Sequence, residues 1–536
     1  MKLKLFIFII FSTFSIVAYT QQLTFPLANP FFNDLEKNLY SPANLFHTSV
    51  RPWLISEINK VENIDSVKNL HLINSKSSRK ICKNISDLIF NHHLITLVKE
   101  DFKLEVDPVL NFEFGKDFIA NDKSKYLNTR GIQIQGSITD KFSFFSTFYE
   151  NQATFINYID STIRLTNVVP GQGNPKDFKN SGFDYAWASG YISYTPSKHF
   201  NFQFGHGKNF IGDGYRSLLL SDNAFNYPFL KITTNLWRFK YVNLYAEFLD
   251  LKMPHSYDIG FRKKYGTFHY LSYDVNKRLS IGLFESIIWK AADSTGYRGF
   301  DINYLNPIIF FRPVEFSLGS PDNALMGTNI SFKLRKKNVL YGQLLLDEFK
   351  THEVMSGNGW WANKQALQLG VKSFDVFGVK NLYIQTEYNY VRPYTYSSRS
   401  TLQNYAHYDQ ALAHPLGANF KESVSFLKYN YKRFFAELKF NYAVYGADTA
   451  NSNYGKDIFL SYDTHPKEYG NYTGQGIKTT LTYKDFCLSY LINPSTNLNI
   501  SLGISDRNEN SILKKSHSTY VYFGIRTSLN NFYFDF

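Results

Sequence analysis

Apolar and polar side chains alternate over long stretches of the chain beyond residue 100. Phe200, Phe202 and Phe204 alternate with Asn201 and Gln203, and the stretches 104–114, 132–138 and 498–504 have the same pattern. One parity carries aliphatic or aromatic groups, and the other carries amides, hydroxyls or carboxylates. A period of two is typical of β-strands whose two faces meet different surroundings. The pattern therefore predicts a protein built mainly of antiparallel strands.

Alternation alone does not separate a soluble β-sandwich from a membrane barrel, because both have this period. Three features favour the barrel. Many alternating segments are about ten residues long, which is the length of a tilted strand that crosses a bilayer. Tyrosines crowd segment ends, as in 383–390, which suits an interfacial aromatic girdle. Residues 531–536 read as a last aromatic strand that ends on Phe536 and resembles the signal used by the barrel-assembly machinery.

The chain divides into three parts. Residues 1–20 have a basic start, an apolar stretch and small residues before Gln21, which predicts an export signal peptide. Residues 21–100 lack alternation and are expected to form a partly helical periplasmic or plug region, with helices near 50–61 and 81–98. Residues 101–536 are expected to form an all-β transmembrane antiparallel barrel, and about 24 residues per strand and connection give about 18 strands. After the signal, no apolar run reaches the roughly 18 residues of a membrane-spanning helix.

Composition and charge narrow the range of partners. Aromatic residues make up 18% of the 536 residues, which fits pleated strands better than helices. Lys and Arg total 58 against 45 Asp and Glu, a net charge of +13, which would attract an acidic polymer or anionic lipid. No zinc, helix-turn-helix or RNA-binding motif accompanies the charge, so nucleic acid is not expected as a partner. The two cysteines, Cys82 and Cys487, form no cluster, and whether they pair stays open.

The glycine-rich segment 204–221 is the first candidate site. It lacks the Walker spacing of a phosphate loop, so a nucleotide site is not expected. A strand that ends in a tight turn is the better interpretation, with Asp213 and Arg216 paired inside the barrel lumen. Contact with a polar ligand is the alternative.

The segment 301–327 contains Pro307 and Pro313, each of which removes a donor from a strand ladder. We therefore expect this segment to fold inward or to cap the barrel. Arg312 and Glu315, if lumenal, would form a second buried ion pair and extend the lumenal polar network.

The segment 357–365 places Trp360 and Trp361 next to amides and Lys364. Indole rings beside polar groups can stack on a sugar and hydrogen-bond to it, so these three residues are candidate polysaccharide contacts. An interfacial girdle explains the paired indoles equally well.

Signatures of metal binding and catalysis are weak. His407 and His414 are seven positions apart without a third ligand at metal spacing, so neither a metal nor a cofactor is expected. No nucleophile elbow or zinc-protease motif is present, which argues against an enzyme.

The segments 204–232, 304–327, 357–372 and 414–422, together with 46–52, resemble the capsule assembly Wzi family, in particular the branch described as gliding motility protein RemB. The resemblance implies an outer-membrane barrel of about 18 strands with associated helices. It further implies a non-enzymatic role, either in attaching capsular polysaccharide or in gliding over surfaces. It does not identify ligand residues.

These observations lead to one hypothesis and two alternatives. The hypothesis is a non-enzymatic outer-membrane barrel that binds acidic surface or capsular polysaccharide, with outer-membrane lipid and the barrel-assembly machinery as further partners. The alternatives are a channel for small solutes and a barrel hydrolase.

Overall fold

The structure is a computed structural model. It describes residues 22–536 except 29, 70, 73–85, 121–123, 180, 253–259, 294–295, 311–313, 315–316, 318, 320–321, 336 and 349. The predicted signal peptide, Cys82, Arg312 and Glu315 lie outside the described residues.

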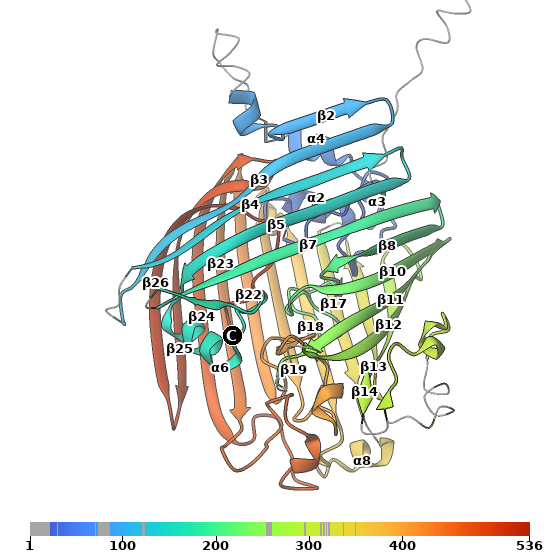
Figure 1. Ribbon diagram of the computed structural model, residues 1–536, viewed down its shortest axis with the longest axis vertical. Coiled ribbons are helices and arrows are strands. Elements are labelled where there is room, and N and C mark those ends of the chain that lie inside the picture. The colour runs from blue at the N-terminus through green and yellow to red at the C-terminus, as the bar shows by residue number, and fades with distance from the viewer. Residues whose placement is uncertain are drawn as a thin grey trace, which may run out of the picture.

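The wall of the molecule is a closed antiparallel barrel of 18 strands, which confirms the predicted fold class (Figure 1). Sequential strands pair with each other, and β26 closes the ring by pairing with β3, where Phe523 lies opposite Phe114. The strands are β3 (Phe102–Asp117), β4 (Lys125–Ile138), β5 (Phe142–Thr154), β7 (Gly182–Ser197), β8 (Phe200–Gly207), β10 (Tyr227–Leu236), β11 (Phe239–Asp250), β12 (Arg262–Asp274), β13 (Leu279–Lys290), β16 (Asn323–Leu334), β17 (Asn338–Leu346), β18 (Gln365–Phe374), β19 (Leu382–Val391), β22 (Phe420–Tyr431), β23 (Phe434–Ala447), β24 (Ile477–Asn493), β25 (Leu498–Ser511) and β26 (Lys515–Thr527).

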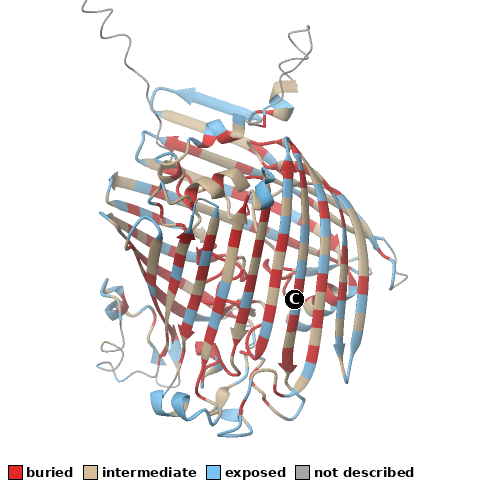
Figure 2. Ribbon diagram, turned by 180° about the vertical axis from the view of Figure 1, so that it is seen from behind, coloured by how far each residue is buried: buried red, intermediate tan, exposed pale blue. Residues whose placement is uncertain are grey.

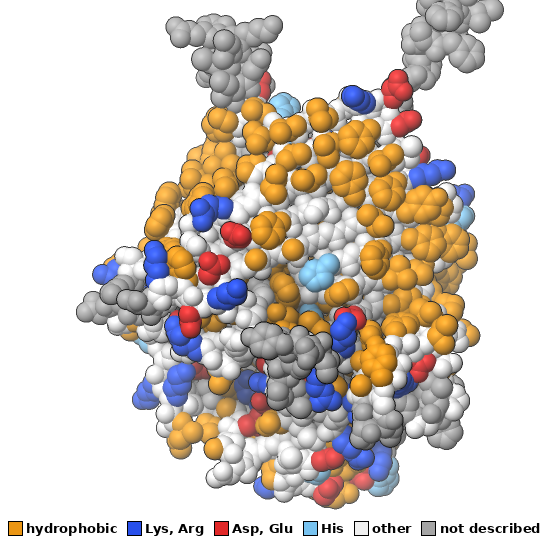
Figure 3. Space-filling view, viewed as in Figure 1, with side chains coloured by type: hydrophobic (Ala, Val, Ile, Leu, Met, Phe, Trp, Pro, Cys, Tyr) orange, Lys and Arg blue, Asp and Glu red, His pale blue; other side chains and the backbone are white. Residues whose placement is uncertain are grey.

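The alternation along these strands separates the outside of the barrel from the lumen. In β8 the three phenylalanines are exposed, whereas Asn201 and Gln203 are buried in the interior. The striped strands of Figure 2 repeat this pattern around the wall. Apolar side chains gather in a band on the outer surface, and charged groups concentrate beyond that band (Figure 3). An apolar exterior around a polar interior is the arrangement that a lipid bilayer requires.

The two ends of the barrel differ. At one end short turns join the strands, for example residues 139–141, 237–238 and 432–433; we call it the short-turn end. At the other end most connections are long, among them 208–226, 291–322, 392–419 and 448–476; we call it the long-loop end. Outer-membrane barrels typically place short turns in the periplasm and long loops outside the cell.

The N-terminal segment lies within the ring of strands at the short-turn end (Figure 1). It contains α2 (Asn33–Leu39), α3 (Ile55–Ile58) and α4 (Ile64–Asn69). Its core packs on Phe435 of the wall, and ion pairs join Lys37 to Asp375 at 2.6 Å and Glu57 to Lys240 at 2.6 Å. These contacts anchor the N-terminal segment to the inner face of the wall at this end.

Two expected helices are shorter than the sequence pattern indicated. Of 50–61 only α3 is helical, because Val50 and Arg51 form β1 (Val50–Arg51) and pair with β9 (Phe210–Ile211). Of 81–98, residues 86–90 are helical, while residues 95–98 belong to β2 (Ile95–Lys99). β2 pairs with residues 102–106 of β3, beyond the point where β26 ends.

Residues 528–536 do not form the expected last strand. The wall is already closed by β26 and β3, so the segment after Thr527 turns into the lumen and remains non-regular. Its extended backbone keeps the period of two. Phe532 and Phe534 pack on aromatic residues of the wall, while Tyr533 and Asp535 hydrogen-bond or ion-pair with residues of the inward loop 208–226. The C-terminal end lies inside the outline of the barrel in both ribbon views (Figures 1 and 2).

Of the segment 301–327 that was expected to fold inward or to cap the barrel, residues 323–327 belong to β16 and Pro313 lies outside the described residues. The part 296–310 differs from the expectation, since it neither folds inward nor caps the barrel. It lies outside the ring of strands (Figures 1 and 2) and contacts β11 and β13 through Tyr241, Tyr245 and Glu285. Pro307 is compatible with this irregular path because its backbone has no donor to satisfy.

The remaining short elements lie in the connections, or, for β6, beside β7. They are α6 (Asn157–Thr166), α8 (Thr351–Ser356), β6 (Lys176–Phe178), β14 (Ala292–Asp293), β15 (Gly296–Tyr297), β20 (Ala406–His407), β21 (Gln410–Ala411), η1 (Ile302–Leu305), η2 (Val376–Gly378), η3 (Thr401–Gln403) and η4 (Tyr462–Thr464). Within the part of the chain that the structure describes, no helix has the length and hydropathy needed to span a membrane.

Candidate polysaccharide-binding face and closed lumen

The centre of the lumen is filled by two inward-folded loops. Leu218, Leu219 and Leu220 of the loop 208–226 are fully buried, and they share an apolar core with Tyr396 and Tyr405 of the loop 392–419. The hydroxyl of Tyr396 donates to the Leu218 carbonyl at 2.8 Å, and that of Tyr405 donates to the Leu219 carbonyl at 2.6 Å. A close-packed apolar core of this kind leaves no aqueous path through the region it fills.

Arg216 is the centre of a buried charge cluster next to this core. Its guanidinium lies 2.9 Å from Glu422 and 3.0 Å from Asp535, and His414 contacts the same Glu422 at 2.6 Å. Burial alone would raise the pKa of the Asp535 carboxyl, but Arg216 and Lys439 outweigh burial and hold that pKa below its ordinary value. Three distant segments, 208–226, β22 and 528–536, are therefore tied together by charge.

Asp213 does not form the expected pair with Arg216. It accepts hydrogen bonds from the hydroxyls of Tyr40 at 2.9 Å and Thr48 at 2.5 Å, and from the Asn329 amide at 2.8 Å. Asp213 thus binds the N-terminal segment to the inward loop. Asp213 and Arg216 are both buried within the barrel, but each has its own partners. Arg312 and Glu315 lie outside the described residues.

The tryptophan segment lies at the long-loop end. Trp361 stacks on His465, with ring centroids 4.3 Å apart, and its indole N–H donates to Glu468 at 3.0 Å. The Lys350 ammonium lies 4.6 Å from the ring centre of Trp360. Trp361 therefore holds two long loops together, and Trp360 is the more peripheral of the two indoles.

Lys364 is fully buried, so its ammonium is not accessible to a glycan. It lies 3.0 Å from Asp347 and 3.3 Å from Glu348, and it donates to the Ser397 carbonyl at 3.0 Å. Burial raises the pKa of Asp347 to about 6, although Lys364 opposes the shift. The structure thus places Lys364 beneath the tryptophan segment as an anchor.

A cleft of about 390 Å³ lies beside this segment, between β19, β22 and the loops 347–364 and 448–476. Two cations, Arg392 and Lys421, and two tyrosines, Tyr390 and Tyr472, line it, together with Asn363 and Asn471 and with Glu353. The alternation that identified β19 and β22 contained no sign of this cleft, because the residues come from four separate stretches.

Arg392 is held in place at the base of the cleft. Its Nε donates to the Asn363 carbonyl at 2.7 Å, and a terminal nitrogen donates to the Trp360 carbonyl at 3.3 Å. The Asn363 side chain is buried, and its Oδ1 accepts no hydrogen bond from any described residue. Lys421 is exposed and lies 5.8 Å from the Tyr390 ring centre. Fixed cations, an orphaned acceptor and tyrosine rings are groups that can bind an acidic sugar.

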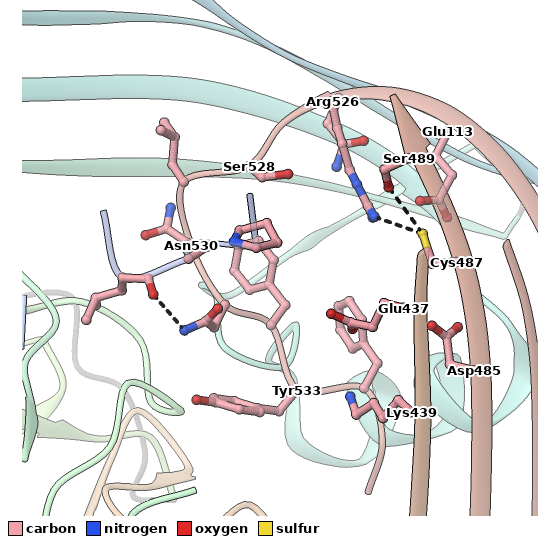
Figure 4. A pocket seen from close by; sticks show the side chains of 18 of the residues that line it. Glu113, Glu437, Lys439, Asp485, Cys487, Ser489, Arg526, Ser528, Asn530 and Tyr533 are labelled. Carbon is pink, nitrogen blue, oxygen red and sulfur yellow. Dashed lines mark hydrogen bonds between the residues drawn. The ribbon is translucent and has the colours of Figure 1, made fainter. Parts of the chain in front are cut away.

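A second cavity, of about 460 Å³, remains inside the barrel between the N-terminal segment, residues 528–534 and the wall. Arg526, Cys487, Asp485, Glu437 and Lys439 project into it (Figure 4). An Arg526 nitrogen lies 3.9 Å from the Cys487 sulfur, and Lys439 pairs with Asp535 at 2.9 Å. The cavity extends from the N-terminal segment to Tyr158 and Gln172 of the connection 155–181, so it reaches toward the long-loop end along the wall. Among the described residues, no group of three or more His, Cys, Asp or Glu side chains is arranged to hold a metal ion.

Comparison with known proteins supports the fold and goes no further. No family model matches the chain, and no curated protein matches it. Among solved structures, the chain resembles Wzi of Escherichia coli, an outer-membrane protein described as a carbohydrate-binding β-barrel involved in group 1 capsule assembly. The two are 12% identical, the match covers 93% of this chain and 98% of Wzi, and the TM-score is 0.52. OprD of Pseudomonas aeruginosa matches at 12% identity over 80% of this chain and 93% of its own, with a TM-score of 0.42. The chain therefore has an outer-membrane barrel architecture like that of Wzi.

Proposed function

We propose that this protein is a non-enzymatic outer-membrane barrel that retains acidic surface polysaccharide at its long-loop end. The observation that carries the proposal is the cleft lined by Arg392, Lys421, Tyr390 and Tyr472, which opens beside the tryptophan segment while the lumen behind it is filled. A guanidinium and an ammonium attract sugar carboxylates, and tyrosine rings stack on sugar faces. The likeness to Wzi, whose description includes carbohydrate binding, is consistent with this proposal.

Trp360 belongs to the proposed binding face, because its carbonyl accepts from Arg392 and its neighbour Gly359 lines the cleft. Trp361 and Lys364 support that face by joining loops, through His465 and Asp347 respectively. The retained polymer would serve either capsule attachment or gliding, and the proposal covers both roles. A deletion strain scored together for capsule retention and for spreading on agar distinguishes the two.

The binding experiment uses purified full-length protein in detergent and immobilised acidic polysaccharide. We expect the double substitution Arg392→Gln with Lys421→Gln to abolish most retention, and wild-type retention to fall as salt is raised, since exposed charges are screened. The double substitution Lys514→Gln with Lys515→Gln is the control for net charge, because both residues are exposed at the hairpin between β25 and β26 and neither lines the cleft. Equal retention by the double variant and the wild type would refute the site.

The channel and the hydrolase receive less support. The apolar core around Leu218–Leu220 occupies the path that a solute would need. Hydrolysis of lipid or ester substrates, lost on replacing one Ser or Asp, would instead favour the enzyme.

A further inference from the structure

The outer wall at β11–β13 carries polar residues where a lipid-facing surface is expected. Asn243, His269 and Glu285 lie in one cross-strand row, because Asn243 is opposite His269 and His269 is opposite Glu285. Their even-numbered neighbours point inward, since Val242, Leu244, Phe268 and Phe284 belong to the lumenal core. The three polar residues therefore point outward, and we call them the polar row.

The polar row lies within the apolar band. On one side Asn243 is opposite Ile232 of β10, and on the other side Glu285 is opposite Met326 of β16. Polar side chains at this depth would be costly if they faced lipid. Yet Asn243, His269 and Glu285 are only 4%, 1% and 1% exposed.

Residues 296–310, which we call the outer strap, cover the row from outside. Five hydrogen bonds join the strap's backbone to side chains of β11, β12 and β13, one of them from the Trp289 indole to the Gly299 carbonyl at 3.2 Å. Tyr241 donates to the Pro307 carbonyl at 2.6 Å, Tyr245 to the Leu305 carbonyl at 3.0 Å and Thr267 to the Tyr304 carbonyl at 3.4 Å, while the Phe310 N–H donates to Glu285 at 2.6 Å. An aromatic cluster of Tyr265, Trp289 and Tyr304 fixes the strap's first half to β12 and β13.

The opposite side of the strap is mainly apolar, and no described residue covers it, although Asn303 is exposed there too. Ile302 is 75% exposed and Ile308 is 65% exposed, and Leu305 and Phe310 are exposed beside them. Irregular backbone is tolerated at membrane depth only where its polar groups are satisfied by protein, and the hydroxyls and the carboxylate beneath the strap supply that satisfaction.

We propose that the outer strap is a lipid-contacting element: the polar row and its neighbouring hydroxyls bind the strap's backbone to the wall, and Ile302, Leu305 and Ile308 face the acyl chains of the bilayer. Continuity with the lipid-facing band selects acyl chains as the occupant. The neighbouring outward residues Leu230 and Leu283 are also exposed and apolar. The segment that interrupts the barrel pattern thus restores the apolar surface over a polar wall.

The test uses full-length protein in which both native cysteines are replaced by serine, with one cysteine introduced by Ile308→Cys and labelled with bimane. The protein is reconstituted in phosphatidylcholine vesicles that contain lipids with a nitroxide on the acyl chain. We expect strong quenching by the acyl-chain nitroxide and little quenching by aqueous iodide. The control Ile512→Cys, at an exposed hairpin of the long-loop end, should show the reverse.

A second variant tests how the strap is held. Tyr241→Phe with Tyr245→Phe removes two of these five hydrogen bonds, so iodide quenching at position 308 should rise. Tyr388→Phe, on the outer face of β19, should leave that quenching unchanged. Quenching at 308 by iodide but not by the lipid nitroxide would overturn the proposal. Protection from both quenchers would also overturn it, because a protein such as a second copy would then cover the strap.

Discussion

The buried charge cluster around Arg216 gives a prediction about stability. Replacing Arg216 by Met leaves Glu422 and Asp535 buried without their main counter-charge, so we expect the free energy of unfolding to fall by about 3–5 kcal/mol. Urea unfolding in detergent micelles measures this loss.

Arg399 offers a matched control, because its guanidinium pairs with Asp463 at 3.1 Å but is 74% exposed. Arg399→Met should change the free energy of unfolding by less than about 1 kcal/mol. Equal losses for the two variants would show that the Arg216 cluster is not a stabilising centre.

Lys208 provides a prediction of pH dependence. Burial lowers the pKa of its ammonium to about 8 in the folded protein, where it donates to the carbonyls of Gly171 and Asp222. Between about pH 8 and the ordinary lysine pKa near 10.4, the unfolded chain binds more protons, so stability should rise with pH. The Lys208→Met variant should lack this rise. The free energy of unfolding of the wild type and of the variant, measured as a function of pH, checks the prediction. If the difference in unfolding free energy between the wild type and the variant stays constant from pH 7 to 11, the lowered pKa of Lys208 is contradicted.

Sequence reasoning located several of these residues but not their partners. It placed Asp213 and Arg216 in the lumen, yet Glu422 is 206 positions from Arg216, and no local spacing announces such a contact. The sequence also pointed to the tryptophan segment, but it did not reveal that Lys364 is buried. That burial depends on the ion pair with Asp347, which follows the end of β17. Neither Arg392 nor Lys421 was indicated as a site residue by any sequence motif.

At the scale of the elements, the most specific prediction concerns residues 528–536. The wall is complete at Thr527, so a chain that lacks 528–536 should still form a barrel. Its removal takes Tyr533 and Asp535 from the lumen and leaves Arg216, Lys439 and Asp222 without those partners. We expect a higher single-molecule conductance in planar bilayers than for the full chain.

The loop-end substitutions Ile512→Ser and Leu513→Ser serve as the control, since both side chains are exposed and remote from the lumen. They should leave the conductance unchanged. If the shortened chain fails to insert at all, residues 528–536 act in insertion, as their resemblance to a terminal strand first indicated.

Strands could be predicted from the sequence wherever an alternating segment is paired with its neighbours in the barrel wall. The pattern failed at 531–536, because an extended segment between two different lumenal surfaces has the same period as a strand. It failed at β2 (Ile95–Lys99) because a strand of five residues is too short for its pattern to be distinguished from the end of a helix. The outer strap was recognised as irregular from Pro307. Which side of the wall it covers depends on Tyr241, Tyr245 and Glu285, which are 25 to 66 positions from their partners in the strap.

For the whole molecule, filling of the lumen predicts a barrel that does not conduct. The reconstituted full chain should show no large steady conductance, because the N-terminal segment closes one end and the apolar core fills the centre. A stable conductance of porin size would contradict this and would favour the channel.

The strand number followed from length alone, because strand and connection together average about 24 residues in such barrels. What occupies the interior could not be read in this way. Polar inward faces are equally compatible with a water-filled pore and with a hydrogen-bonded plug, and only the three-dimensional contacts separate them.

The position of residues 528–536 also constrains the order of assembly. Both they and the helical segment join the wall at the short-turn end, so both enter through the same opening. On β23 the helical segment packs on Phe435 beside the turn, whereas Asp535 reaches Lys439 and Asn441 farther inside. Residues 40–51 of the N-terminal segment reach the inward loop 208–226 as well, through Tyr40 and Thr48 on Asp213. We therefore expect both ends of the chain to dock on this loop after the wall has closed, and the finished barrel to be held from both termini.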